Sequence, residues 1–125
     1  MPDSIQETLA AIRQFSKERD WEKFHTPKSV VISAAIEMGE LLGQFQWVTD
    51  DRMKEHVEKN IDTITKEMAD VTDYIFRLSD ILGVDLLKAM EEKRAENARK
   101  YPVEKVKGRS DKYDTYTEDT PEHRG

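Results

Sequence analysis

The sequence predicts an all-α fold, and three observations support this prediction. Apolar residues recur every three or four positions over four segments, which is the spacing of one face of a helix. No stretch alternates apolar and polar residues as a half-buried strand does. The connections between the segments are short, so neighbouring helices are expected to run antiparallel in a four-helix bundle.

The first two helices are predicted from capping residues and apolar spacing. Ser4 and Glu7 have the spacing of a capping box, and apolar residues follow at helical intervals, so the first helix covers about residues 4 to 18. Thr26 followed by Pro27 is typical of an N-cap with a first-turn proline. The second helix therefore begins there and is expected to run to about Trp47.

Two further helices follow. The third is predicted to begin near Asp51 and to end at Gly83, because glycine is the usual residue just beyond a helix C-terminus. Asp85 is placed to cap the fourth. That helix is expected to stop at Tyr101 and Pro102, since proline disfavours a helical conformation in the residue before it.

Chain length limits the number of domains. With 125 residues and a mass of 14.6 kDa the chain suits one small domain, predicted to cover residues 1–103. Residues 104–125 are polar and contain too few apolar groups to offset the entropy of ordering, so a disordered tail is expected. The third helix is longer than its neighbours can cover, which predicts association into a dimer or tetramer.

Composition excludes several classes of protein. The net charge of -6 argues against a nucleic-acid partner, because phosphate backbones require a basic surface. The absence of cysteine excludes disulfides and thiolate metal sites and fits a reducing compartment, so the cytoplasm is the expected location. No apolar run approaches the roughly 20 residues of a membrane span, and the acidic start differs from a signal peptide, so no membrane partner is expected.

Two pairs of acidic residues lie near the apolar stripes of the second and third helices. Glu37 with Glu40, and Glu67 with Asp70, are each three residues apart and share a helix face. If both pairs meet in one groove, their repulsion raises their pKa values or requires a cation. Carboxylate oxygens suit Mg²⁺, with Mn²⁺ as a substitute. The alternative for each pair alone is a solvated face, because 26 acids in this chain produce about five such pairs by chance.

Cationic and aromatic residues supply candidate contacts for a nucleotide. Lys93, Asn97 and Lys100 share one face of the fourth helix and suit phosphate and sugar, although basic residues near a helix C-terminus also stabilise the helix dipole. Trp21 and Trp47 offer faces for base stacking. Ordinary packing is the alternative for each tryptophan, and a satisfied turn residue is the alternative for the nearby histidine.

Together these residues resemble a known family, the all-α nucleoside triphosphate pyrophosphohydrolases of the MazG type, and within it the dCTP pyrophosphatase branch. The superfamily motif, E-x-x-E and then E-x-x-D, reads Glu37 to Glu40 and Glu67 to Asp70 here. The branch is similar over about residues 5 to 103, in the stretches "ERDWEKFHTPKS", "GELLGQFQW", "MADVTDYIFRLSDILGVDLLKA" and "KRAENARKYPV".

The resemblance implies a site, a cofactor and a reaction. The four motif acids are expected to bind Mg²⁺ and to form the catalytic centre of a dimer or tetramer. The nucleoside pocket is expected to include Trp21, His25, Trp47 and Tyr74, and the residues expected beside the phosphates or sugar are Lys93, Asn97, Lys100 and Tyr101. The implied reaction splits a nucleoside triphosphate, with dCTP or a modified cytosine nucleotide suggested, into a monophosphate and pyrophosphate. Glu37 and Glu40 remain alternative general bases.

Two other functions fit part of the sequence. A non-catalytic helical interaction module would use the apolar stripes to pair chains, and its stability would not respond to divalent metal. A di-iron carboxylate bundle needs Glu-x-x-His on two helices. Only Glu22 and His25 have that spacing, and they lie in an aperiodic link rather than in a predicted helix.

Overall fold

The computed structural model describes residues 4–108, and this part of the chain contains helices and turns but no strand. The predicted all-α class is confirmed. The helices are α1 (Ile5–Glu18), α2 (Pro27–Gly43), α3 (Met53–Leu82), α4 (Leu86–Lys100) and α5 (Val103–Val106), with two 3₁₀ turns, η1 (Glu22–Phe24) and η2 (Asp50–Arg52). No helix in the described range is both long enough and apolar enough to cross a membrane.

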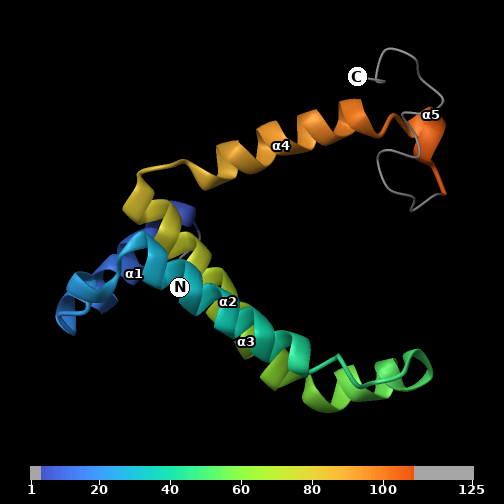
Figure 1. The fold of residues 1–125 in the computed structure, drawn as a ribbon, viewed down its shortest axis with the longest axis horizontal. Helices are drawn as coiled ribbons and strands as arrows, with labels where there is room; N and C mark the ends of the chain where they lie inside the picture. Colours follow the sequence, from blue (N-terminus) through green and yellow to red (C-terminus); the bar gives the residue numbers. More distant parts are fainter. Residues whose placement is uncertain (1–3, 109–125) are drawn as a thin grey trace. The chain divides into compact units, whose positions relative to one another are not determined.

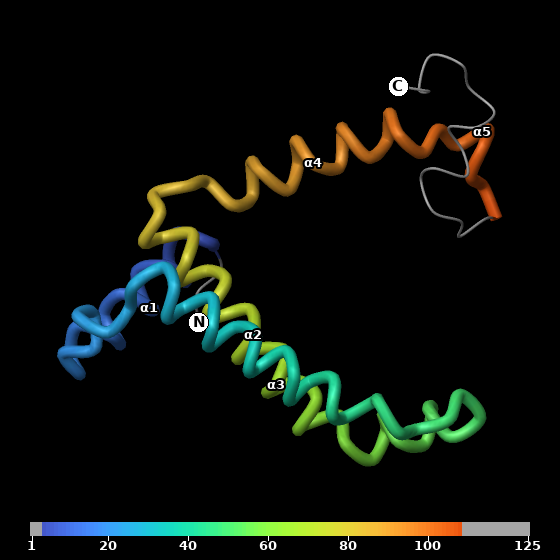
Figure 2. Tube along the Cα trace, in the orientation of Figure 1, coloured from blue at the N-terminus to red at the C-terminus, as the bar shows by residue number. Residues whose placement is uncertain are grey.

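The chain divides into two units, Met1–Val84 and Asp85–Gly125. In the first unit α2 and α3 lie side by side, and α1 packs against α3 (Figure 1). The trace reverses its direction between α2 and α3, so these two helices are antiparallel (Figure 2). The second unit contains α4 and α5. The four-helix antiparallel bundle stays a prediction.

Side-chain caps begin three of the helices at the predicted residues. Ser4, Thr26 and Asp85 each accept a hydrogen bond from the backbone N–H three residues further on, at 3.1, 3.1 and 3.0 Å. Each bond satisfies one of the N–H groups that a helix start leaves without an intrahelical acceptor. The caps therefore set where α1, α2 and α4 begin.

The helix ends agree less uniformly with the predictions. α3 ends at Gly83, whose φ of 67° is the left-handed conformation that glycine adopts without strain. α2 ends at Gly43 rather than near Trp47, so that prediction was wrong. After Gly43 the backbone tightens into turns, in which the N–H groups of Phe45 and Gln46 both donate to the carbonyl of Leu42. Glycine is also a poor residue for continuing a helix.

α3 bends at Asn60, whose φ of -116° and ψ of 17° are not helical. The side-chain amide of Asn60 donates to the carbonyl of His56 at 2.9 Å. That carbonyl is the acceptor that the backbone N–H of Asn60 would use in a regular helix. Competition between the side chain and the backbone for one acceptor explains the bend.

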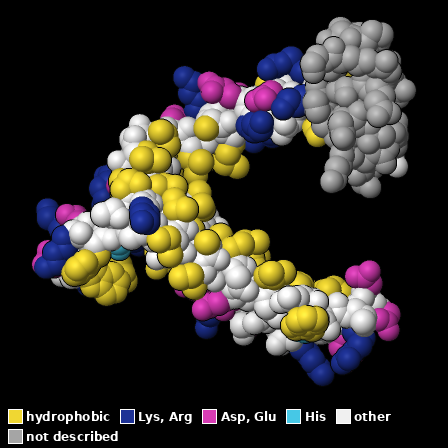
Figure 3. All heavy atoms as spheres, in the orientation of Figure 1, with side chains coloured by type: hydrophobic (Ala, Val, Ile, Leu, Met, Phe, Trp, Pro, Cys, Tyr) yellow, Lys and Arg dark blue, Asp and Glu magenta, His cyan; other side chains and the backbone are white. Residues whose placement is uncertain are grey.

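The core of the first unit is small. Its buried apolar residues are Ile12, Val30, Ala34 and Ile64. Other members of the apolar stripes stay in contact with solvent, and hydrophobic side chains are visible along α2 and α3 (Figure 3). One chain therefore leaves much of the apolar surface of this helix pair uncovered.

In the second unit the surface of α4 changes along its length. Hydrophobic side chains give way to charged ones toward its C-terminal end (Figure 3). The helix stops at Lys100, just before Tyr101 and Pro102, as predicted. The polar tail was expected to begin at residue 104, but residues 104–106 belong to α5, and residues 109–125 lie outside the described part. The boundary predicted after residue 103 stays a prediction.

Candidate active site

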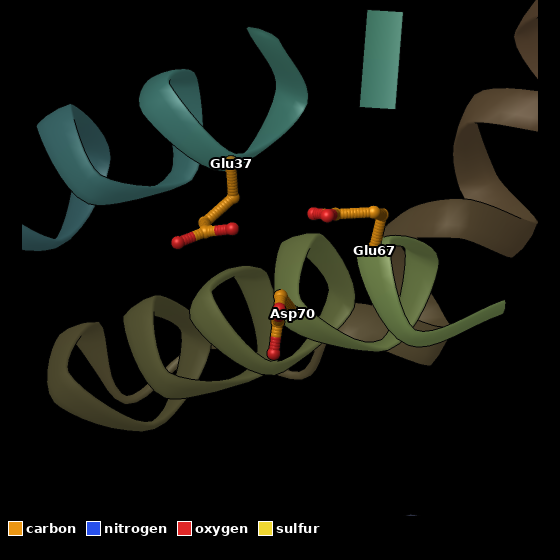
Figure 4. A group of neighbouring side chains, drawn as sticks. All are labelled: Glu37, Glu67 and Asp70. Carbon is orange, nitrogen blue, oxygen red and sulfur yellow. The ribbon is translucent and has the colours of Figure 1, made fainter. Parts of the chain in front are cut away.

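An acid cluster forms where α2 faces α3. Glu37 on α2 lies opposite Glu67 and Asp70 on α3 (Figure 4), and one carboxylate oxygen of each lies within 4.8 Å of the other two. The spacing of three residues places Glu67 and Asp70 on one face of α3. The packing of α2 against that face then brings in the third carboxylate. Three of the four predicted acids therefore converge from two helices.

Glu40 is the fourth member of this acid cluster. It lies one turn along α2 from Glu37, and its charge acts to raise the pKa values of both Glu37 and Glu67. Glu40 is exposed, whereas Glu37 and Glu67 are half-buried. The cluster therefore has a solvent-facing side at Glu40 and a more enclosed side between the helices.

The electrostatics of the acid cluster disfavour four negative charges. Burial raises the pKa of Glu37, and a hydrogen bond with Glu40 and the charges of Glu40, Asp70 and Glu67 raise this pKa further. Burial also raises the pKa of Glu67, as do the charge of Glu40, a hydrogen bond with it and the charge of Asp70. A positive ion among the carboxylates would relieve this repulsion.

Two oxygens of the acid cluster lack a donor. Glu37 Oε2 and Glu67 Oε2 are both buried without a hydrogen-bond partner among the described residues. A buried acceptor without a partner is costly, because the oxygen has lost its hydration and gained nothing in return. Carboxylate oxygens from two helices are the ligands that hard divalent cations prefer. The residues present therefore fit the expected Mg²⁺ or Mn²⁺.

A second polar cluster is centred on Arg77 of α3, which is only 8% exposed. Its Nη1 donates to Ser16 Oγ on α1 and lies 3.1 Å from Nδ1 of His25. Its Nη2 donates to Asp73 Oδ2 at 2.8 Å. The guanidinium thus ties α1 and α3 to the segment that precedes α2.

Arg77 and Asp73 were not among the site residues predicted from the sequence. Their spacing could have indicated a role, because an acid and a base four residues apart on one helix can pair. A charged residue among the apolar positions of a helix is buried only when it has such partners. Burial and the charge of Arg77 lower the pKa of His25, while the charges of Asp73 and Glu22 raise it. The net effect is a lowered pKa, so His25 is neutral at pH 7.

Two pockets lie against Arg77. A pocket of about 260 Å³ is lined by Glu22, His25 and Arg77, among others. A larger pocket of about 410 Å³ is lined by residues that include Phe15, Asp70 and Arg77. Asp70 therefore belongs both to the acid cluster and to the wall of the larger pocket.

The predicted aromatic residues are not all together. Trp21 packs edge-on against Phe15, with ring centroids 5.8 Å apart. Tyr74 lies beside Arg77, whose guanidinium carbon is 5.8 Å from the ring centroid. Trp47 is 84% exposed beyond the other end of α2. The 17 residues of α2 span about 25 Å, so within one chain Trp47 does not share a pocket with Trp21.

The predicted phosphate-binding residues lie in the second unit, from the middle of α4 at Lys93 to its C-cap at Tyr101. Lys93 and Lys100 both pair with Glu96, at 3.4 and 3.2 Å. Hydrogen bonds from Lys100 and Lys93 lower the pKa of Glu96. The carbonyl of Asn97 accepts a bond from the N–H of Tyr101 at 2.8 Å. The lysines therefore share one face of α4, as predicted, with a carboxylate between them.

Comparison with known proteins agrees with the motifs. The model of the MazG-like family matches residues 32–115. The chain is 34% identical over 116 residues to dCTP pyrophosphatase 1 of Homo sapiens and of Rattus norvegicus, which covers 88% of this chain and 68% of each relative. Its structure is similar to that of a pyrophosphatase from Archaeoglobus fulgidus, with a TM-score of 0.77, 36% identity and coverage of 82% of this chain and 95% of the other. The resemblance is confirmed, and the chain belongs to the MazG-like family.

Proposed function

We propose that this protein is a Mg²⁺-dependent pyrophosphohydrolase that converts dCTP, or a modified cytosine deoxynucleoside triphosphate, to the monophosphate and pyrophosphate. The observation that carries the proposal is the acid cluster with its two unpartnered buried oxygens. The enzyme class rests on the relatives: with 34% identity to dCTP pyrophosphatase 1 and 36% identity to an archaeal pyrophosphatase, the chain is a nucleotide pyrophosphohydrolase.

The acid cluster supplies the proposed metal ligands, Glu37, Glu40, Glu67 and Asp70. When bound, Mg²⁺ would neutralise negative charge on the phosphate oxygens and lower the pKa of the attacking water. Glu37 and Glu40 are the two carboxylates proposed to hold that water and take its proton. Glu37 is half-buried between the helices, whereas Glu40 is exposed to solvent. Both stay candidates for the general base.

The nucleoside would lie against Arg77, with its sugar in the larger pocket, which Asp70 and Phe15 also line. Its base would lie toward the smaller pocket, which His25 lines. Three of the predicted nucleoside-binding residues contact side chains that line the larger pocket. Trp21 contacts Phe15, and His25 and Tyr74 contact Arg77. A triphosphate held at the acid cluster would thus place its sugar and base among aromatic and polar side chains.

We infer that the active form is a homo-oligomer, a dimer or tetramer. Large apolar side chains of the helix pair are exposed, such as Ile36 at 58% and Leu42 at 53%. Burial against a second copy removes this surface from water. Trp47 joins the nucleoside-binding residues only if it comes from such a copy, because α2 separates it from them within one chain.

The phosphates and sugar would contact Lys93, Asn97, Lys100 and Tyr101 of α4. The two lysines already converge on one carboxylate, that of Glu96. A triphosphate carries more negative charge than that carboxylate, so it can replace Glu96 as the ion-pair partner of the two lysines.

Pyrophosphate release from natural and modified triphosphates, measured with Mg²⁺, Mn²⁺ or EDTA, tests the function. Glu40→Gln and Asp70→Asn should each nearly abolish release while leaving the helical circular dichroism intact. Unchanged turnover in both variants contradicts the proposed metal centre. The alternative, a non-catalytic interaction module, predicts no effect of Mg²⁺ on thermal unfolding, whereas an ion that binds only the folded state raises the Tm.

A further inference from the structure

We infer that Arg77 is a positioning residue that holds His25 as the Nε2–H tautomer, so that His25 offers a hydrogen-bond donor to the ligand of the smaller pocket. The identity of that ligand, a nucleoside triphosphate, rests on the proposed function. The state of the His25 ring follows from the protein alone.

The chemistry of the two groups sets the direction of their hydrogen bond. Nη1 of Arg77 lies 3.1 Å from Nδ1 of His25. A guanidinium stays protonated in proteins and has no acceptor atom, so it can only donate. Nδ1 must therefore accept. A neutral imidazole that accepts at Nδ1 carries its proton on Nε2.

Both partners of this bond are held in place. The guanidinium of Arg77 also donates to Ser16 and to Asp73, and the residue is buried, so it cannot rotate without losing these bonds. His25 follows η1, and its backbone N–H donates to the carbonyl of Glu22 at 3.1 Å. A catalytic or binding side chain locked by such supporting contacts presents one geometry to its ligand.

The charges around His25 come from two elements. Arg77 and Asp73 face it from α3, and Glu22 faces it from η1. Burial and the positive charge of Arg77 oppose protonation more strongly than the two carboxylates favour it. The other charged side chains that line the smaller pocket, Arg13 of α1 and Asp80 of α3, pair with each other at 2.8 Å.

The tautomer determines which kind of nucleobase atom can pair with His25. His25 supplies a donor, and the carboxylate of Glu22 in the same pocket supplies an acceptor. Cytosine offers an amino donor at N4 next to the unprotonated N3, whereas thymine and uracil offer an acceptor at O4 next to N3–H. A donor at His25 pairs with N3 of cytosine or with O4 of thymine and uracil, so the tautomer sets the direction of one hydrogen bond to the base and does not select the base by itself.

Histidine ¹⁵N spectra of the full chain, without nucleotide, test the tautomer. The His25 signals are identified by their loss in His25→Gln. In the wild type at pH 7 we expect Nδ1 without a proton and Nε2 with one. Arg77→Met removes the hydrogen-bond donors but keeps a long side chain. We expect His25 in this variant to lose its preference for the Nε2–H tautomer and to have a higher pKa. Arg13→Met is the matched control, because Arg13 lines the same pocket but pairs with Asp80, and it should leave the His25 signals unchanged.

The wild-type spectrum decides the inference even if an Arg77 variant does not fold. A His25 that carries its proton on Nδ1, or both protons, at pH 7 overturns it. In folded Arg77→Met, KM for dCTP should rise up to roughly tenfold with kcat little changed, as loss of one net hydrogen bond predicts. If KM stays unchanged, the role of Arg77 in positioning His25 for binding is wrong. If no triphosphate is hydrolysed by the wild type, the proposed function fails, while the tautomer result stands separately.

Discussion

Glu37 on α2 and Glu67 on α3 each bury a carboxylate oxygen that has no hydrogen-bond partner within residues 4–108, and the repulsion between these carboxylates acts to separate the two helices. Apolar packing at Val30, Ala34 and Ile64 holds these helices together. The acid cluster therefore opposes the packing of the first unit until a cation or a neutralising substitution removes the repulsion.

Glu67→Gln should raise the Tm in EDTA and abolish the further rise that Mg²⁺ produces in the wild type. The substitution removes a charge from the acid cluster but also removes a proposed metal ligand, and activity should nearly disappear, as for Glu40→Gln and Asp70→Asn. Thermal unfolding with and without Mg²⁺ checks this. Glu58→Gln removes an exposed charge from the same helix outside the cluster and serves as the control. A normal Mg²⁺ response in Glu67→Gln would contradict the prediction.

His25 should make stability depend on pH. Its pKa is lowered in the folded state, so between that pKa and about 6.5 the unfolded chain binds more protons than the folded one. The stability contributed by neutral His25 is complete above pH 6.5 and is lost as the pH falls through the folded pKa. Denaturant unfolding at several pH values measures the difference in free energy of unfolding between the wild type and His25→Gln. If that difference is the same at pH 8 and at pH 5, the folded and unfolded pKa values of His25 are equal.

The two glycines Gly83 and Gly39 should respond oppositely to alanine. Gly83 has a φ of 67° and open space around its Cα, so Gly83→Ala should cost about 1–2 kcal/mol through backbone strain alone. Gly39 lies within α2, also without neighbours that a Cβ would meet, so Gly39→Ala should stabilise by about 0.5–1 kcal/mol. Urea unfolding in EDTA compares them. Equal effects would mean that the backbone at Gly83 does not require glycine.

Substitutions at Ile64 and Trp47 test the core and the proposed contact surface separately. Ile64 is 4% exposed, so Ile64→Ala should reduce the free energy of unfolding by about 2–5 kcal/mol. Trp47 is 84% exposed, so Trp47→Ala should change the stability of a dilute, monomeric chain by less than about 0.5 kcal/mol. Its effect should appear instead in the association of chains and in KM. Loss of monomer stability in Trp47→Ala, with KM unchanged, would place this residue in a core.

Local chemistry explains which features could be predicted from the sequence. A cap needs only a side chain and a backbone N–H three residues away, so the starts at Ser4, Thr26 and Asp85 were predictable. The bend at Asn60 and the end of α2 at Gly43 arise where side-chain and turn hydrogen bonds compete with the helix. Spacing patterns do not report such competition.

For the candidate site, the sequence by itself determined that Glu37 and Glu40, and Glu67 and Asp70, share helix faces, because spacing along a helix is a local property. Only the tertiary structure decided that the two faces meet and leave two oxygens without donors. It also decided that Arg77 of α3 reaches His25, which lies in the connection between α1 and α2. Distances between residues far apart in the chain depend on how whole helices pack, and no local pattern carries that information.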